Sequence, residues 1–224
     1  MMLESPNFDM PLAEAMRTQR AIRRLKPDPV GDALVLRLLD LAIRAPSGSN
    51  AQSWEFIVVR DPGIKKAFAR IHRRTLRTYR WARRGAAPPT ARRRRIMESV
   101  YWQADHFEEI PVIVVACLKG FYVPFVHVSA TSYFGSIFPA VQNLLLAARA
   151  AGLGAALITV PLWNLPAARR ILGLPWSVTP CAMIPLGWPI DPYGPTTRKP
   201  VREVVSFDRY GNRAPAPGEP QGRS

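Results

Sequence analysis

The chain has 224 residues and 48% of them are apolar, which is enough to build one compact domain with a substantial core. It carries 31 Lys and Arg residues against 16 Asp and Glu residues, a formal net charge of +15 at pH 7. A basic chain can bind nucleic acid, a membrane surface or an anionic ligand. No helix-turn-helix, zinc-finger or RNA-binding signature accompanies the charge, which argues against nucleic acid.

Cysteine and histidine usage argues against a disulfide framework and a metal site. Cys117 and Cys181 lie in apolar runs and are expected to be buried free thiols. There is no C-x-x-C pair, and the three histidines are scattered without metal-ligand spacing. The amino terminus lacks the apolar core of a signal peptide, and Arg149 and Pro161 interrupt the longest apolar stretches. We therefore expect a cytoplasmic protein without a membrane span.

The first part of the chain predicts two helices followed by a strand. A helix is expected over Pro11–Thr18, and a second one begins with Asp32 as its cap. The second helix has apolar residues at helical spacing along one face: Val35, Leu38, Leu39, Ala42 and Ile43. Trp54–Val59 is short, apolar and rich in β-forming residues, so it predicts a strand.

A strongly basic region follows this strand. Helices are expected over Ile64–Arg80 and Ala91–Glu108, with a break at 85–90 where two prolines stand together. Arginines crowd both helices. They indicate either an anionic substrate or simply a solvated face.

The second half of the chain predicts strands and helices in irregular alternation. The expected elements are a strand at Pro111–Leu118, an irregular aromatic stretch at Gly120–Gly135, a mostly apolar helix at Ser136–Ala151, a strand at Ala155–Thr159, a helix at Pro166–Leu172, a strand at Thr179–Leu186, an extended arm at Val201–Phe207 and a disordered tail from Gly211. Helices and strands without regular β-α-β order indicate an α+β fold.

A basic turn follows the first helix. Arg20, Arg23 and Arg24 offer guanidinium donors, which suit a phosphate group. The alternative is a solvated basic turn, and these residues alone favour that alternative.

A small polar turn precedes the first strand. Pro46 to Asn50 is a turn-forming run in which Ser47 and Asn50 supply a hydroxyl and an amide. Gly48 removes a side chain where a flat ring could lie close to the backbone. The alternative is a helix stop, which these residues alone leave equally open. Taken together, the two turns suggest a bound flavin nucleotide and therefore a redox enzyme.

These turns resemble the signatures of the FMN-dependent nitroreductase family, and the likeness runs from about Ala13 to Tyr210. The stretches that carry it are Arg20–Arg23, Lys26–Val30, Ala45–Trp54, Pro139–Ala148, Gly152–Gly154, Leu172–Pro175, Ile184–Pro189 and Arg198–Pro200. The chain departs from the family pattern at Ala21, where a Ser usually reaches phosphate, and at Ser53, where a Pro usually precedes the Trp.

The resemblance implies a nitroreductase-like α+β fold, in which helices flank a mixed central sheet and two subunits form a domain-spanning dimer with a C-terminal arm. It implies one FMN-binding domain over 10–210, a variable lid insertion over 65–109 and a tail over 211–224. It also implies a homodimer with the flavin at the subunit interface.

The resemblance further implies where FMN binds. The implied cofactor residues are Gln19, Arg20, Ala21, Ile22, Arg23, Pro46, Ser47, Gly48, Asn50, Ile158, Thr159, Val160 and Arg198. The first turn would hold the phosphate and ribityl chain, with Arg23 extending toward the pyrimidine edge. The polar turn would reach the flavin from the partner subunit. Ile158 to Val160 would lie beside the isoalloxazine, and Arg198 would bind phosphate. Because flavin N5 carries the chemistry, no protein residue is expected to be catalytic.

The implied activity is transfer of hydride from NAD(P)H through FMN to an electron-poor acceptor, nitroaromatic or quinone-like, by a ping-pong mechanism. Other reactions on the same fold are reductive dehalogenation of halotyrosines and flavin fragmentation. A flavin-binding or anion-binding protein without turnover is the alternative from another class.

Overall fold

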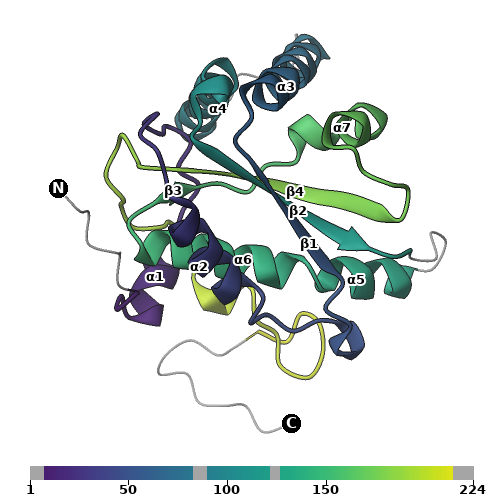
Figure 1. The fold of residues 1–224 in the computed structure, drawn as a ribbon. Coiled ribbons are helices and arrows are strands. Elements are labelled where there is room, and N and C mark those ends of the chain that lie inside the picture. The colour runs from purple at the N-terminus through teal and green to yellow at the C-terminus, as the bar shows by residue number, and fades with distance from the viewer. Residues whose placement is uncertain (1–7, 83–89, 122–126, 214–224) are drawn as a thin grey trace, which may run out of the picture. The chain divides into compact units, whose positions relative to one another are not determined.

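The computed structural model describes residues 8–82, 90–121 and 127–213. Its contacts divide the chain into two compact units, Met1–Gly194 and Pro195–Ser224. The sheet and the α-helices belong to the first unit (Figure 1). Most of the break expected at 85–90 and most of the expected tail lie outside the described residues.

Four strands form the sheet, in the order β1-β2-β4-β3. Their bounds are Trp54–Val59 for β1, Val112–Lys119 for β2, Gly154–Ala155 for β3 and Val178–Gly187 for β4. All three pairings among these strands are antiparallel, so the sheet of the described residues is not the mixed sheet that we expected. The segment expected to be an extended arm, Val201–Phe207, supplies no further strand, because Val201–Glu203 forms a 3-10 helix after Pro200.

Strand β2 is the centre of the fold, because every residue from Val112 to Leu118 is buried. Alternate side chains of a strand point to opposite faces of the sheet. Val112, Val114 and the other even-numbered residues of β2 pack into one apolar core. Ile113, Val115 and Cys117 pack into a second core on the opposite face.

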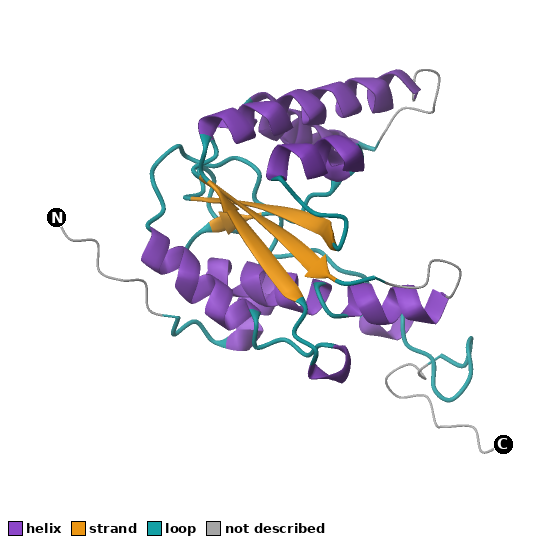
Figure 2. Cartoon of the chain, turned by 45° about the vertical axis from the view of Figure 1, so that its right-hand side comes forward, coloured by secondary structure: helices purple, strands orange, loops and turns teal. Residues whose placement is uncertain are grey.

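Helices cover both faces of the sheet (Figure 2). Helices α2 (Asp32–Ala42) and α6 (Phe138–Ala150) pack together and contribute to the first core. Helices α3 (Pro62–Ala82) and α7 (Leu165–Leu172) contribute to the second core. The remaining α-helices are α1 (Leu12–Thr18) beside α6, α4 (Ala91–Asp105) beside α3, and α5 (His127–Gly135). None of the helices in the described part of the chain is both long and apolar enough to cross a membrane.

Three expectations about local structure were wrong. The stretch at Gly120–Gly135 contains helix α5 rather than irregular chain, because contacts such as that from the Tyr133 hydroxyl to the Leu118 carbonyl, 3.1 Å, override its weak helix propensity. The third strand ends at Ala155, and only an isolated bridge at Ile158 continues the pairing. Asp32 does not cap α2, because Gly31 occupies the cap position and Asp32 is the first helical residue; its carboxylate pairs with Arg60 at 2.6 Å.

The His72 side chain is the largest polar group in the second core. It is 1% exposed, and its ring meets that of Phe107 edge to face with centroids 5.3 Å apart. Desolvation by burial, and secondarily the charge of Arg73, lowers the pKa of His72 to about 4. The imidazole is therefore neutral in the folded protein at any pH above that value.

This burial makes stability depend on pH. Below pH 6.5 the unfolded chain protonates His72 and the folded chain does not, so the stability present above pH 6.5 is lost as the pH falls toward 4. Between pH 7 and pH 5 the linkage amounts to about 2 kcal/mol. His72→Leu should lack this component. The free energy of unfolding, measured by urea denaturation, should therefore fall about 2 kcal/mol less from pH 7 to pH 5 in the variant than in the wild type. Equal losses in the two proteins would contradict the assignment.

Candidate functional site

The basic turn predicted to bind phosphate, Gln19–Arg23, is called the phosphate turn below. It lies against β3, an edge strand of the sheet. Gln19 ends helix α1, and Arg20 and Ala21 are exposed. The backbone N–H of Ile22 donates to the carbonyl of Ala155 in β3 at 2.9 Å. The buried Ile22 side chain thus anchors a turn whose neighbouring residues face outward.

Two glycines let this segment approach the sheet closely. A Cβ atom on Gly154 would lie 2.6 Å from Leu25 Cδ2 and 2.8 Å from Ile22 Cγ2. A Cβ atom on Gly187 would lie 3.2 Å from Leu25 Cβ. Beyond Leu25, the N–H of Lys26 donates to the carbonyl of Trp188 at 2.8 Å. The backbone from Ile22 to Lys26 therefore runs along this corner of the sheet like a short additional strand.

Arg23 is not the solvated arginine of the alternative interpretation. Its side chain is half-buried, and its Nη1 donates to Ser99 Oγ on α4 over a long 3.4 Å. Its buried Nε has no hydrogen-bond partner among the described residues. Desolvation by burial lowers the pKa of the Arg23 guanidinium. A half-buried cation with an unused donor is suited to bind a carbonyl or anionic oxygen of a ligand.

Arg24 points to a different partner from Arg23. Its guanidinium lies 5.3 Å from the ring centroid of Trp102 on α4 and 3.8 Å from the Asp191 carboxylate. Together with Arg95, Glu98 and Ser99, Arg24 and Trp102 line a cavity of about 310 Å³ between the turn and α4. The sequence offered Trp102 as a lid aromatic that could stack on substrate, but neither Ser99 nor the contact of Trp102 with Arg24 was predicted, because no local pattern shows which face of α4 meets the turn.

The predicted ring-side residues lie on the same edge of the sheet as the phosphate turn. Ile158 exchanges two backbone hydrogen bonds of 2.9 Å with Met183 of β4. Thr159 then leaves the extended conformation, and Val160 begins a 3-10 helix. Ile158 is only three residues beyond Ala155, the partner of Ile22. The structure therefore brings these two parts of the predicted site together.

The polar turn has an unusual backbone. Ser49, Asn50 and Gln52 have positive φ angles of 51°, 52° and 50°. A non-glycine residue in this left-handed region costs on the order of 1 kcal/mol. Helix α2 has already ended at Ala42, well before these residues. A simple helix stop therefore does not explain them.

Local hydrogen bonds hold the polar turn in this conformation. Gly48 N–H donates to Ser136 Oγ at 3.0 Å, and Gln52 N–H donates to Ser47 Oγ at 3.0 Å. Gln52 Nε2 donates to Asn50 Oδ1 at 3.1 Å. The indole Nε1 of Trp54 donates to the carbonyl of Ser136 at 2.6 Å, which ties β1 to the end of α5. The turn is a built structure that presents Pro46 and Asn50 to the surface.

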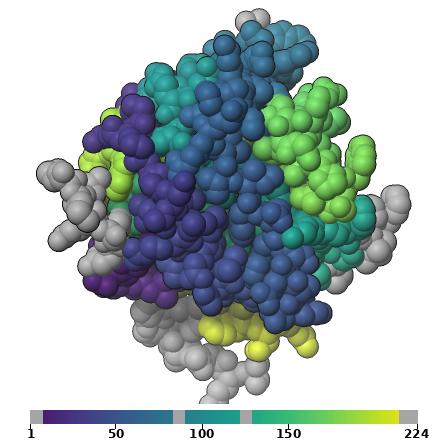
Figure 3. All heavy atoms as spheres, in the orientation of Figure 1, coloured from purple at the N-terminus to yellow at the C-terminus, as the bar shows by residue number. Residues whose placement is uncertain are grey.

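The two turns lie at diagonally opposite corners of the sheet. Trp54, which follows the polar turn, pairs with Leu118 near the end of β2. The phosphate turn packs on Gly154 of β3, the opposite edge strand. The partner of Gly154 is Gly187 of β4, one residue beyond the residue that pairs with Val112 at the start of β2. At about 3.3 Å per residue, the corners are roughly 20 Å apart along the strands alone. Figures 1 and 3 show the purple segment around 19–30 and the blue turn before β1 on opposite sides of the same view.

Arg198 belongs to the second unit, Pro195–Ser224. It is exposed, and its guanidinium donates to the carbonyl of Thr197 at 3.0 Å. Its role in binding phosphate stays a prediction. Within the described residues, no group of three or more His, Cys, Asp or Glu side chains is gathered as a metal site would require.

Comparisons with known proteins agree with this architecture. A protein of Thermus thermophilus named NADH dehydrogenase is 27% identical over 219 residues, covering 84% of this chain and 91% of its own length. An iodotyrosine deiodinase of Thermotoga neapolitana is 29% identical over 194 residues, covering 87% and 94%. A crystal structure of oxidized iodotyrosine deiodinase bound to FMN and 3-iodo-L-tyrosine aligns with a TM-score of 0.69 at 23% identity, covering 89% of this chain and all of that one.

The family profile described as "Nitroreductase family" matches residues 16–188. That range contains the phosphate turn, the polar turn and all four strands. The chain therefore belongs to the nitroreductase family of oxidoreductases.

Proposed function

We propose that this protein is an FMN-dependent oxidoreductase that takes hydride from NAD(P)H and passes it to an electron-poor acceptor, nitroaromatic or quinone-like. The observation that carries the proposal is Arg23, a half-buried cation with a free Nε beside the sheet edge. Membership of the nitroreductase family supports it, as does the FMN bound in the related deiodinase structure.

In this proposal, two groups of residues would contact an FMN molecule. Backbone N–H groups and Arg20 in the turn Gln19–Arg23 would hold the phosphate and ribityl chain, while Ile158–Val160 would lie beside the ring. When bound, FMN supplies the hydride chemistry, and the protein supplies position and electrostatics.

Arg23 would set the electrostatics of the ring. A guanidinium held in a partly desolvated position stabilises negative charge on an adjacent oxygen or nitrogen more than it would in water. Arg23 would therefore favour the reduced, anionic form of the flavin. Ser99 would orient the guanidinium from α4 through its 3.4 Å contact.

We infer that the complete site needs two copies of the chain. Because the polar turn lies at the corner diagonal to the phosphate turn, one copy would meet the flavin with its phosphate turn and the second copy with Pro46–Asn50. An exposed apolar surface, formed by the helices that cover the first core, supports a homodimer. It includes a groove of about 270 Å³ lined by Phe8, Met10, Leu12, Ala15, Leu41, Asn143, Leu146, Ala147 and Ala150.

Reductive dehalogenation of a halotyrosine is the second candidate reaction. The 29% identity to a protein named iodotyrosine deiodinase, over nearly the full length of both chains, favours it. Both reactions would use the same flavin and the same Arg23. We place NAD(P)H oxidation first, because a relative named NADH dehydrogenase is similar over a comparable length. The small-molecule acceptor and the cytoplasmic location stay predictions.

Anaerobic reduction tests the proposed function. The purified protein should be yellow, bind about one FMN per subunit, as the family resemblance implies, and lose its flavin absorbance on mixing with NADH or NADPH. Subsequent addition of a nitroaromatic or quinone should restore the absorbance, while 3-iodotyrosine should not. Faster reoxidation by 3-iodotyrosine would select the dehalogenase, and a colourless protein unable to bind FMN would refute both.

Arg23 variants test the electrostatic role. Arg23→Ala should lower the flavin midpoint potential and slow reduction about tenfold or more, because it removes the cation from the ring. Arg23→Lys should restore most of the potential, since it retains the charge. Arg92→Ala, which removes an exposed arginine on α4, is the matched control and should leave the potential unchanged. A midpoint potential that changes equally in Arg23→Ala and in the control would contradict a specific role of Arg23 beside the ring.

A further inference from the structure

The basic character of the chain is concentrated on one pair of helices. The 48 residues of 62–109 contain 13 of the 31 Lys and Arg residues but only four of the 16 acidic residues. Helix α3 buries one face through Phe68, Ala69, His72 and Leu76. Its opposite face carries five arginines within the eleven residues 70–80, about 15 Å of helix.

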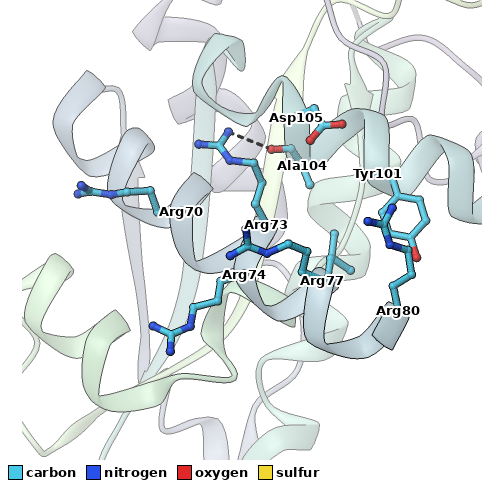
Figure 4. Close-up of a pocket in the computed structure, with 9 residues that line it drawn as sticks. Arg70, Arg73, Arg74, Arg77, Arg80, Tyr101, Ala104 and Asp105 are labelled. Carbon is cyan, nitrogen blue, oxygen red and sulfur yellow. Dashed lines mark hydrogen bonds between the residues drawn. The ribbon is translucent and has the colours of Figure 1, made fainter. Parts of the chain in front are cut away.

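These arginines line a groove rather than a flat surface. The groove has a volume of about 530 Å³, within the usual range for a small-molecule site. Tyr101 and a single carboxylate, Asp105, of α4 line it together with five arginines of α3: Arg70, Arg73, Arg74, Arg77 and Arg80. Figure 4 shows Arg73 and Arg80 reaching toward α4, while Arg70 and Arg74 extend the basic surface to the other side.

Only part of this positive charge is compensated within the protein. Arg73 pairs with Glu108 at 2.8 Å, and the Arg80 guanidinium lies 5.8 Å from the ring centroid of Tyr101. No carboxylate of the described residues forms an ion pair with Arg70, Arg74 or Arg77. Like charges three and four residues apart on a helix destabilise it. An anion in the groove would relieve this repulsion.

The surroundings favour a compact ligand with several phosphates. One guanidinium group can donate two parallel hydrogen bonds to the oxygens of one phosphate. Several arginines along one helix can therefore bind several linked phosphates. A neighbouring groove of about 440 Å³ shares Arg77 and Arg80 and is also lined by Trp81, which is 67% exposed and could stack on a ring. A single concave site of this size fits a nucleotide or polyphosphate better than a nucleic-acid strand, which needs a continuous track.

The groove is separate from the turn that would hold FMN. Ser99 and Trp102, which contact Arg23 and Arg24, lie on one face of α4. Tyr101 and Ala104, which line the groove, lie on another face, nearly half a turn away at 3.6 residues per turn.

We propose that the groove between α3 and α4 binds a small molecule carrying two or more phosphate groups. The ligand has two possible sources. One is the phosphate end of the dinucleotide co-substrate, an assignment that rests on the proposed function. The other is a separate nucleotide or polyphosphate that acts on the enzyme from outside its flavin site.

Calorimetric titration with inorganic tripolyphosphate at fixed ionic strength tests the proposal on the full chain. Arg74→Gln/Arg77→Gln removes two groove arginines, whereas Arg92→Gln/Arg93→Gln removes the same charge from exposed positions of α4 that do not line the groove. Wild type and control should bind with similar affinity, and the groove variant at least tenfold more weakly. Absence of binding to the wild type, or equal weakening in both variants, would overturn the proposal.

Competition identifies the source without relying on the flavin. Displacement of tripolyphosphate by NADPH at lower concentration than by ATP assigns the groove to the co-substrate, and the reverse order assigns it to a separate nucleotide. Either order supports the site, including in a preparation that binds no FMN. Tight binding of a single-stranded 12-mer oligonucleotide that tripolyphosphate cannot displace would instead make the groove part of a nucleic-acid surface and overturn the proposal.

Discussion

The register of β2 against its two neighbours is the constraint on which the rest of the structure depends. Every residue of β2 from Val112 to Leu118 is buried, with alternate side chains in two different cores, so a slip of one residue would exchange the cores. This register fixes where β1 begins and where β4 lies, and β3 in turn pairs with the end of β4. It therefore fixes the two corners at which the polar turn and the phosphate turn leave the sheet. The separation of the two half-sites follows from strand pairing and not from the turns themselves.

At each of these two corners, the residues proposed to bind the flavin are held in an arrangement that is unusual in a protein interior or turn. At one corner, Gly154 lets Ile22 and Leu25 approach the backbone, and the neighbouring Arg23 is carried into a partly desolvated position without a full set of partners. At the other corner, Ser49 and Asn50 are held in the left-handed region by the bonds to Ser47 and Ser136. Unused donors and strained backbone are costly, and they are typical of functional sites.

Much of the fold could be predicted from the sequence, because its signals are local. Strand β1 has the predicted bounds, and β2 and α6 are displaced by no more than two residues at either end, since apolar runs and helical periodicity specify them directly. Helix α5 could not be predicted, because tertiary contacts such as that of Tyr133 with β2 decide its conformation. The residues of the candidate site came from turn chemistry and family resemblance. Ser99 and the contact of Trp102 with Arg24 were not predicted, because these residues meet the turn across about 76 residues of sequence.

Flavin content of mixed dimers tests the central claim, that each site combines two copies of the chain. One copy would carry Arg20→Ala/Arg23→Ala in the phosphate turn and the other Ser47→Ala/Asn50→Ala in the polar turn, with different affinity tags for purification of the mixed dimer. Each variant alone should form a dimer that has lost its flavin. The mixed dimer has one site with both defects and one intact site, so it should regain about half of the wild-type FMN content. A mixed dimer as empty as its parents would mean that both turns of a site come from the same chain, which contradicts the account.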